Sequence, residues 1–240
     1  GAKLDELTIP QLCEKRSKMH FGEKAGSRYQ MLSSAYQMIQ AGNYHCPDSF
    51  KDILRQYQET DSGLDYEYRR FYSSYDQIED TTGFEPLRDL VENIYTNEYL
   101  ETLLPKWNSA MQELDAFTQL PLQRDFYARK VKNAKERTVV IISDAMRYEV
   151  GKELFRRMQD DPKCSAKLEV QLSVLPSYTR LGMAVLLPHT ELTMTDDFKV
   201  LVDGLPCDNL AEREVVLQKY NSDAVCVQFD SIKSLKIAEL

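Results

Sequence analysis

The sequence lacks paired cysteines, long apolar runs and a glycine-rich loop that could cradle a phosphate. The five cysteines are scattered, with no CxxC pair: Cys13, Cys46, Cys164, Cys207 and Cys226. That pattern suits a reducing cytoplasm and argues against a structural zinc site. No run of 18 apolar residues predicts a membrane helix, and no signal peptide is recognisable. We therefore expect a cytoplasmic protein without a membrane anchor.

Histidine is also scarce, and the chain has no excess of basic charge. The three histidines are His20, His45 and His189, and the net charge is −8 over 240 residues. An acidic balance argues against a nucleic-acid surface covering the whole molecule. Residues 124–137 are the local exception, with six Lys or Arg in fourteen positions. We interpret them as a solvated helix face, with a phosphate or nucleic-acid contact as the alternative. Direct nucleic-acid binding is not expected.

Residues 3 to about 133 predict an all-helical region, because apolar and aromatic residues recur at spacings of three and four. Tyrosine is concentrated there: eleven of the fourteen tyrosines precede residue 137. Phenols at the margin of a helical core explain this bias, and a stacking platform for single-stranded bases is the alternative. We take residues 1–136 as a helical region.

From residue 138 the pattern predicts an α/β fold with a partial, mostly parallel sheet. Strands are predicted at 138–143, 168–174 and 224–229, with a weaker one at 198–202. Amphipathic helices are predicted at 146–158 and 209–219, the first with Met146, Val150, Leu154 and Met158 on one face. Three or four strands are few for a ligand-binding sheet. We therefore expect residues 137–240 to be the first part of a longer domain.

Asp144 and Thr179 follow the first two predicted strands. In a parallel βαβ unit both residues would lie at the carboxyl edge of the sheet, where such folds bind ligands. Each also suits a helix cap. A carboxylate beside a hydroxyl is the pairing that metal-assisted phosphate chemistry uses. A haloacid-dehalogenase site is disfavoured, because position 146 is Met rather than Asp.

Two motifs resemble those of a known family. They are ISDAMRYEV at residues 142–150 and LPSYTRLGMAVLLPH at residues 175–189. They are similar to the PglZ family, type A, of the bacteriophage-exclusion (BREX) defence systems, which carries an alkaline-phosphatase-superfamily domain. Residues 66–72 and 90–100 resemble the helical region that precedes this domain.

The resemblance implies a role for each residue of the pair. Asp144 matches the first metal-binding aspartate, and Thr179 matches the nucleophile, which also contacts the metal. Two divalent ions, usually zinc, would activate the hydroxyl in the full-length protein. The remaining Asp and His ligands have no matching motif after Thr179. Asp203 and Asp230 are candidates, but neither lies in a matching motif. We therefore expect weak or absent zinc binding and no hydrolysis by this chain alone.

The sequence thus predicts part of a metal-dependent phosphohydrolase, a phosphatase or phosphodiesterase. Arg147 and Arg180 could meet phosphate, but solvent or a carboxylate partner is favoured, and His189 is assigned a structural role. The alternative function is a non-catalytic scaffold or sensor whose helical region docks other defence proteins. The resemblance points to an adenine-specific DNA methyltransferase as such a partner. The substrate and the metal remain open.

Overall fold

The structure is a computed structural model of the chain, and it describes residues 8–20, 22–112 and 120–234. The chain divides into two compact units. The helical unit is Gly1–Ala116 with Met146–Leu168, and the mixed unit is Phe117–Ala145 with Glu169–Leu240. The chain therefore crosses between the units three times. The domain boundary proposed at residue 136 divides the chain differently and stays a prediction. None of the helices described is long and apolar enough to cross a membrane.

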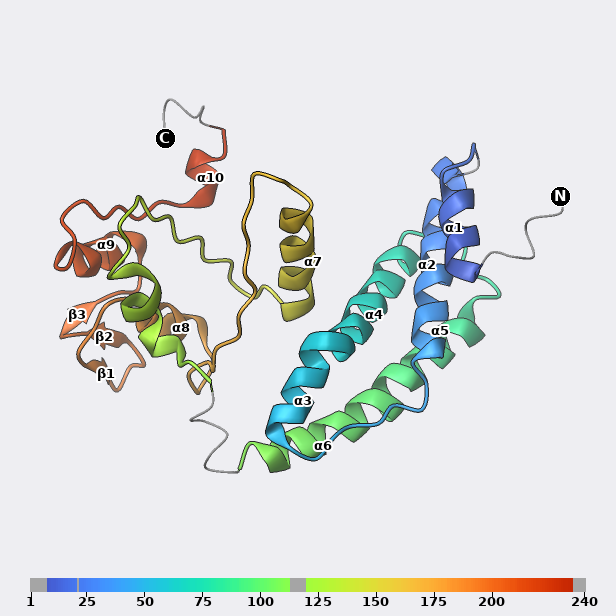
Figure 1. The fold of residues 1–240 in the computed structure, drawn as a ribbon, viewed down its shortest axis with the longest axis horizontal. Helices are drawn as coiled ribbons and strands as arrows, with labels where there is room; N and C mark the ends of the chain where they lie inside the picture. Colours follow the sequence, from blue (N-terminus) through green and yellow to red (C-terminus); the bar gives the residue numbers. More distant parts are fainter. Residues whose placement is uncertain (1–7, 21, 113–119, 235–240) are drawn as a thin grey trace. The chain divides into compact units, whose positions relative to one another are not determined.

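The helical unit consists of α-helices with two π-helical turns (Figure 1). Its elements are α1 (Ile9–Ser17), α2 (Gly22–Gln40), α3 (Phe50–Gln56), the π-helical turn η1 (Tyr57–Asp61), α4 (Ser62–Tyr75), α5 (Glu85–Asn93), the π-helical turn η2 (Ile94–Leu100), α6 (Glu101–Ala110) and α7 (Tyr148–Gln159). The helical periodicity is confirmed between residues 9 and 110. Residues 3–7 and 113–119 of the predicted region lie outside the described residues.

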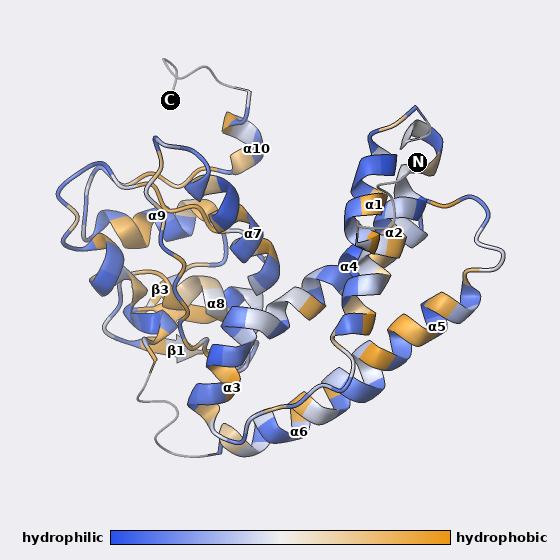
Figure 2. Cartoon of the chain, turned by 45° about the vertical axis from the view of Figure 1, so that its right-hand side comes forward, coloured by the Kyte–Doolittle hydropathy of each residue, from blue (hydrophilic) through white to orange (hydrophobic). Residues whose placement is uncertain are grey.

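Helices α2, α4 and α5 supply the main core of this unit. The buried core side chains are Met31, Ala35, Met38, Phe71, Ile78, Val91 and Ile94. The three from α2 recur at spacings of four and three, which places them on one face of the helix. Figure 2 shows the same amphipathic pattern as hydrophobic and hydrophilic residues alternating along α5 and α6.

Tyrosines surround this core and donate their hydroxyls to carboxylates. Tyr68 and Tyr72 both donate to Glu92, at 2.8 and 2.6 Å. Tyr57 donates to Asp65 at 2.7 Å. Burial, together with the hydrogen bond to Glu92, raises the pKa of Tyr68 to about 12. The phenols therefore stay protonated and serve as donors at the core margin, as the helical-core interpretation predicts.

Helix α7 packs on α4 through a charged face. Glu149 is 3% exposed and forms an ion pair with Arg69 of α4. The Lys152 ammonium donates to the carbonyls of Gln58 and Glu59, at 2.5 and 3.1 Å. A π-helical turn such as η1 disturbs the regular hydrogen-bond ladder, so its carbonyls can accept from a side chain. The predicted amphipathic helix is confirmed. It belongs to the helical unit, where it contacts α4 and η1.

The apolar face of α7 remains exposed. Met146, Val150, Leu154 and Met158 are between 39% and 48% exposed. These four residues, which we call the α7 stripe, recur every four positions. Val150, Leu154 and Met158 share one side of α7, and Met146 lies two residues before the helix begins. Exposed apolar residues in a contiguous row are a feature of surfaces that another element covers.

The mixed unit contains a small antiparallel sheet (Figure 1). Its elements are the 3₁₀ turn η4 (Gln123–Asp125), the π-helical turn η5 (Tyr127–Val131), α8 (Thr179–Val185), β1 (Leu192–Met194), β2 (Val200–Val202), β3 (Leu205–Pro206), α9 (Leu210–Gln218) and α10 (Phe229–Ile232). The strand order is β1-β2-β3, with Thr193 opposite Leu201. Val200 and Val202 of β2 are buried among residues of α8 and α9. The helix predicted at 209–219 and the weaker strand at 198–202 are confirmed.

The predicted parallel sheet is not formed by the residues that the structure describes. Residues 138–143 and 224–229 run without strand pairing, and Ile141 is 82% exposed. Apolar composition predicted these strands, but a strand also needs a neighbour to accept and donate its backbone hydrogen bonds. The composition of one segment does not reveal that neighbour.

One trace of parallel pairing remains. Leu172, in the segment predicted as a strand at 168–174, forms an isolated parallel bridge with Leu122. The Leu172 amide donates to the Pro121 carbonyl at 2.8 Å, and the Gln123 amide donates to the Leu172 carbonyl at 2.9 Å. The partner of this segment therefore lies in a stretch that the sequence interpretation had placed in the helical region.

Replacing Glu149 by Ala tests the attachment of α7. The change leaves Arg69 without its buried partner, so we expect the free energy of unfolding to fall by about 2 kcal/mol. Fully buried pairs lose roughly 3–5 kcal/mol, and the effect here is smaller because the Arg69 side chain is 31% exposed. Chemical denaturation followed by circular dichroism measures the loss. Glu153→Ala, which removes a surface partner of Arg156, is the matched control. Equal effects of the two changes would contradict the assignment.

Candidate active site

Asp144 lies in a turn directly after the extended segment 138–143. Ala145, the next residue, has φ 56°, a left-handed conformation that costs a residue with a Cβ about 1–2 kcal/mol. Helix α7 begins only at Tyr148, and its N-cap residue is Arg147. Asp144 therefore caps no helix, and the capping alternative is wrong. Its side chain is exposed.

Thr179 is the first residue of α8, and the N-cap position belongs to Tyr178. The predicted capping role of Thr179 is therefore also wrong. Gln123 fixes the local chain from both sides. Its Oε1 accepts from the Val174 amide at 3.2 Å, and its Nε2 donates to the Gly182 carbonyl at 3.2 Å. One side chain thus joins the segment that precedes Thr179 to the helix that begins with it.

The structure brings the side chains of Asp144 and Thr179 together. Thr179 Oγ1 lies 3.4 Å from Asp144 Oδ2, and both residues are exposed. This separation exceeds the roughly 2.5–3.0 Å of a good O–H···O hydrogen bond. Two oxygens that share a tetrahedral cation at roughly 2.0–2.2 Å lie about 3.3–3.6 Å apart. The spacing of the pair therefore fits two ligands of one divalent cation.

The two oxygens are only part of a metal site. Among residues 8–20, 22–112 and 120–234, no group of three or more His, Cys, Asp or Glu side chains is placed to hold a metal. Asp203 instead accepts from the amides of Thr190 and Glu191, at 2.9 and 2.7 Å. Asp230 pairs with Lys233 at 2.9 Å. Both aspartates considered as further ligands therefore have local structural roles.

The other residues considered for phosphate binding lie in ordinary environments. Arg180 Nε is 3.9 Å from Asp208 Oδ1, which confirms that a carboxylate partner accompanies this arginine. Arg147 is exposed and serves as the N-cap residue of α7. His189 Nδ1 lies 2.7 Å from the Leu187 carbonyl oxygen, which fits a structural role.

All six bases of the run 124–137 are exposed, as a solvated face predicts. Lys130 forms an ion pair with Glu169 of the same unit. The backbone here is the 3₁₀ turn η4 followed by the π-helical turn η5, rather than one regular helix. The run therefore does not present its charges along a single helical face.

Two contributors to the site were missed at the sequence level. Gln123 had no distinguishing spacing, because its partners lie about fifty residues further along the chain. No sequence pattern assigns a role to Tyr178, although it directly precedes Thr179. Its hydroxyl donates to the Phe198 carbonyl at 3.5 Å and lies 4.0 Å from the sulfur of Met194. The strand pair β1–β2 is therefore part of the surroundings of Thr179; the sequence predicted β2 only weakly and did not predict β1.

Known proteins match the chain over both units. Residues 125–240 match the model of the BREX system PglZ alkaline phosphatase-like domain. The alkaline phosphatase-like protein PglZ of Bacillus cereus (strain H3081.97) is 36% identical over 242 residues, which are 96% of this chain and 28% of that protein. The alkaline phosphatase-like protein BrxZ of Escherichia coli O9:H4 (strain HS) is 32% identical over 217 residues, 82% of this chain and 25% of that protein. No solved structure matches.

The chain spans about a quarter of the length of these curated relatives. The matched domain includes both Asp144 and Thr179, and the relatives also match most of the helical unit. These matches confirm the resemblance seen in the two motifs. Residues 125–240 carry a PglZ alkaline phosphatase-like domain, in a chain that is similar over most of its length to the curated proteins PglZ and BrxZ.

Proposed function

We propose that the protein containing this chain is a metal-dependent phosphohydrolase of a BREX phage-defence system, acting as a phosphatase or phosphodiesterase. In this proposal Thr179 is the nucleophile, and Asp144 holds a divalent cation together with the Thr179 hydroxyl. The observation that carries the proposal is the 3.4 Å separation of Thr179 Oγ1 and Asp144 Oδ2 in an exposed position. Neither residue is occupied by helix capping.

Thr179 Oγ1 would form the new bond to phosphorus while the bond from phosphorus to the leaving oxygen breaks. The hydroxyl proton would pass to solvent or to the leaving oxygen. Water would then hydrolyse the phosphothreonine and regenerate the enzyme. Asp144 places a carboxyl oxygen beside the hydroxyl, and Gln123 holds the backbone on both sides of Thr179 in place.

A divalent cation bound by Asp144 and Thr179 would lower the pKa of the hydroxyl and neutralise charge on the phosphoryl oxygens. We propose two such ions, zinc, for the full-length protein. Two oxygen donors rarely hold a catalytic metal without further ligands. Because the relatives are about four times as long as the chain, we propose that other parts of the parent protein supply these ligands. In this proposal the chain alone binds zinc weakly and hydrolyses nothing.

Removing the hydroxyl tests the nucleophile. In the full-length parent, Thr179→Ala should reduce zinc-dependent hydrolysis of a phosphate ester by roughly 10³-fold or more, because no other group can form the covalent intermediate. Steady-state release of the leaving group measures the rate. Ser177→Ala removes an exposed hydroxyl two residues away and should leave the rate unchanged. Equal rates for Thr179→Ala and the unchanged parent would eliminate Thr179 as the nucleophile.

Removing the carboxylate charge tests the metal site. Asp144→Asn in the full-length parent should weaken zinc binding by about 100-fold or more. Loss of a direct metal ligand should cost at least as much affinity as loss of a residue that hydrogen-bonds to a ligand. Equilibrium dialysis followed by elemental analysis measures bound zinc without any assay of activity. Asp230→Asn, which disrupts a surface ion pair, is the matched control. Zinc affinity that falls equally in both variants, or in neither, contradicts the role given to Asp144.

The second candidate function is docking of another defence protein by the helical unit. The α7 stripe favours it, because three apolar side chains lie exposed in a row on a helix whose opposite face is already attached, and exposed Met146 shortly precedes that helix. We propose an adenine-specific DNA methyltransferase of the same system as the partner. The domain model that matches the chain is described as that of a BREX system, and a partner could cover an exposed apolar face.

Two leucines of equal exposure allow a matched test of docking. Leu154 in the α7 stripe is 48% exposed, and Leu104 on α6 is 49% exposed. Leu154→Glu in the full-length parent should abolish copurification with the methyltransferase, and Leu104→Glu should not, because only the first change charges the proposed interface. Thermal unfolding of both variants checks that the fold is retained. Retained copurification of a folded Leu154→Glu protein rules out this surface.

A further inference from the structure

The hairpin between β1 and β2 has an unusual residue at its tip. The amide of Thr195 donates to the carbonyl of Lys199, and the amide of Phe198 donates to the carbonyl of Thr195, both at 2.9 Å. These bonds define a three-residue loop, 196–198, whose last residue must adopt a left-handed conformation. Glycine or asparagine normally occupies such a position. Here it is Phe198, with φ 60°.

The ring of Phe198 gains little packing in return for this conformation, since the residue is 70% exposed. The side chain of Asp197 is paired with both residues that flank the loop. Asp197 accepts from the Thr195 hydroxyl at 2.5 Å and forms an ion pair with Lys199 at 2.7 Å. The loop is therefore held in shape by its own hydrogen bonds, and the ring of Phe198 is available for a ligand, beside the exposed carboxylate of Asp196.

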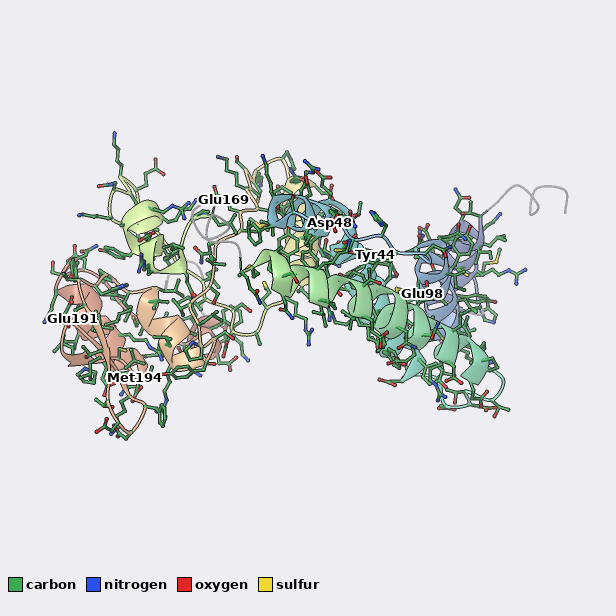
Figure 3. The ribbon with its side chains drawn as sticks, turned by 90° about the horizontal axis from the view of Figure 1, so that it is seen from below. Tyr44, Asp48, Glu98, Glu169, Glu191 and Met194 are labelled. Atoms are coloured by element: carbon green, nitrogen blue, oxygen red, sulfur yellow. The ribbon has the colours of Figure 1, made fainter. Side chains whose placement is uncertain are left out.

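The tip lies next to the nucleophile's helix. Tyr178, the N-cap residue of α8, donates its hydroxyl to the carbonyl of Phe198 at 3.5 Å. The same hydroxyl lies 4.0 Å from the sulfur of Met194, the last residue of β1, which Figure 3 labels. Thr179 follows Tyr178 directly. One tyrosine side chain therefore connects the position of the nucleophile to the hairpin tip, and all these residues belong to the mixed unit.

We propose that Phe198 is a specificity-determining residue that stacks on a flat aromatic ring in the organic part of the phosphate ester attacked by Thr179. This inference rests on the proposed phosphohydrolase function. A conformation that costs stability and exposes an aromatic ring beside a candidate active site is typical of strain retained for binding. Stacking of one flat ring on an aromatic side chain changes affinity by tenfold or more.

The test uses the full-length parent carrying Thr179→Ala, so that binding is measured without turnover. The probes are 4-nitrophenyl phosphate, which has a flat ring, and ethyl phosphate, which has none. In this background Phe198→Ala should weaken binding of 4-nitrophenyl phosphate about tenfold and leave ethyl phosphate unchanged. Phe198→Tyr keeps the ring and should bind both esters as before. Phe229, which is 68% exposed in the same unit, supplies the control Phe229→Ala.

A second measurement separates binding from packing. If the ring serves a ligand, Phe198→Gly should raise the thermal midpoint of unfolding, because glycine adopts φ 60° without strain. A lower midpoint would show that the ring packs in the parent and would overturn the inference. Equal changes for the two esters, or no binding of either, would overturn it as well. The role of Thr179 as nucleophile is tested separately, by comparing the hydrolysis rates of the Thr179→Ala variant and the unchanged parent. The two proposals can therefore fail independently.

Discussion

The separation of 3.4 Å between the Thr179 hydroxyl and the Asp144 carboxylate is the constraint on which the interpretation of this molecule depends. The two residues are 35 positions apart, and the chain between them enters the helical unit and returns. The backbone around each of the two residues therefore has to be held in place by contacts within the mixed unit. Gln123 and the bridge between Leu122 and Leu172 fix the end that carries Thr179. The turn at Asp144 is set by the left-handed residue that follows it.

Backbone strain in this chain is distributed unevenly. Among the described residues, four that are not glycine have positive φ: Asn43, Ala145, Phe198 and Asp203. Asparagine and aspartate tolerate this conformation because their short polar side chains bond locally, as Asp203 does with two amides. Alanine and phenylalanine have no such compensation. Ala145 directly follows Asp144, and the carbonyl of Phe198 accepts a hydrogen bond from Tyr178. Both residues that lack compensation therefore adjoin the candidate site. Strain of this kind is expected to persist where function selects it.

Helical periodicity predicted this fold well, and strand composition predicted it poorly. The apolar face of α7 could be found from four residues of one segment, since a helix satisfies its backbone bonds within itself. Residues 138–143 are equally apolar, but a strand depends on a partner from elsewhere in the sequence. The proximity of Asp144 and Thr179 was expected from a βαβ unit. The structure achieves it with an isolated bridge and a glutamine side chain that no local pattern reveals. The sequence predicted the carboxylate and the hydroxyl of the pair, but it did not predict the contacts that hold the two residues close together.

The acidic composition also acquires a structural explanation. Two carboxylates of the helical unit each accept two phenol hydroxyls: Glu92 from Tyr68 and Tyr72, and Asp65 from Tyr57 and Tyr95. The hydrogen bond from Tyr72 is the main cause that lowers the pKa of Glu92, so this acid stays charged at neutral pH and remains an acceptor. Acidic and aromatic residues are therefore used together inside one network. A platform for single-stranded bases needs free aromatic faces and positive charge. Here Tyr68 and Tyr95 stack on each other at 3.7 Å between ring centroids, and acidic groups surround them. The bias toward tyrosine and acid is thus better explained by how the helices hold together than by an external ligand.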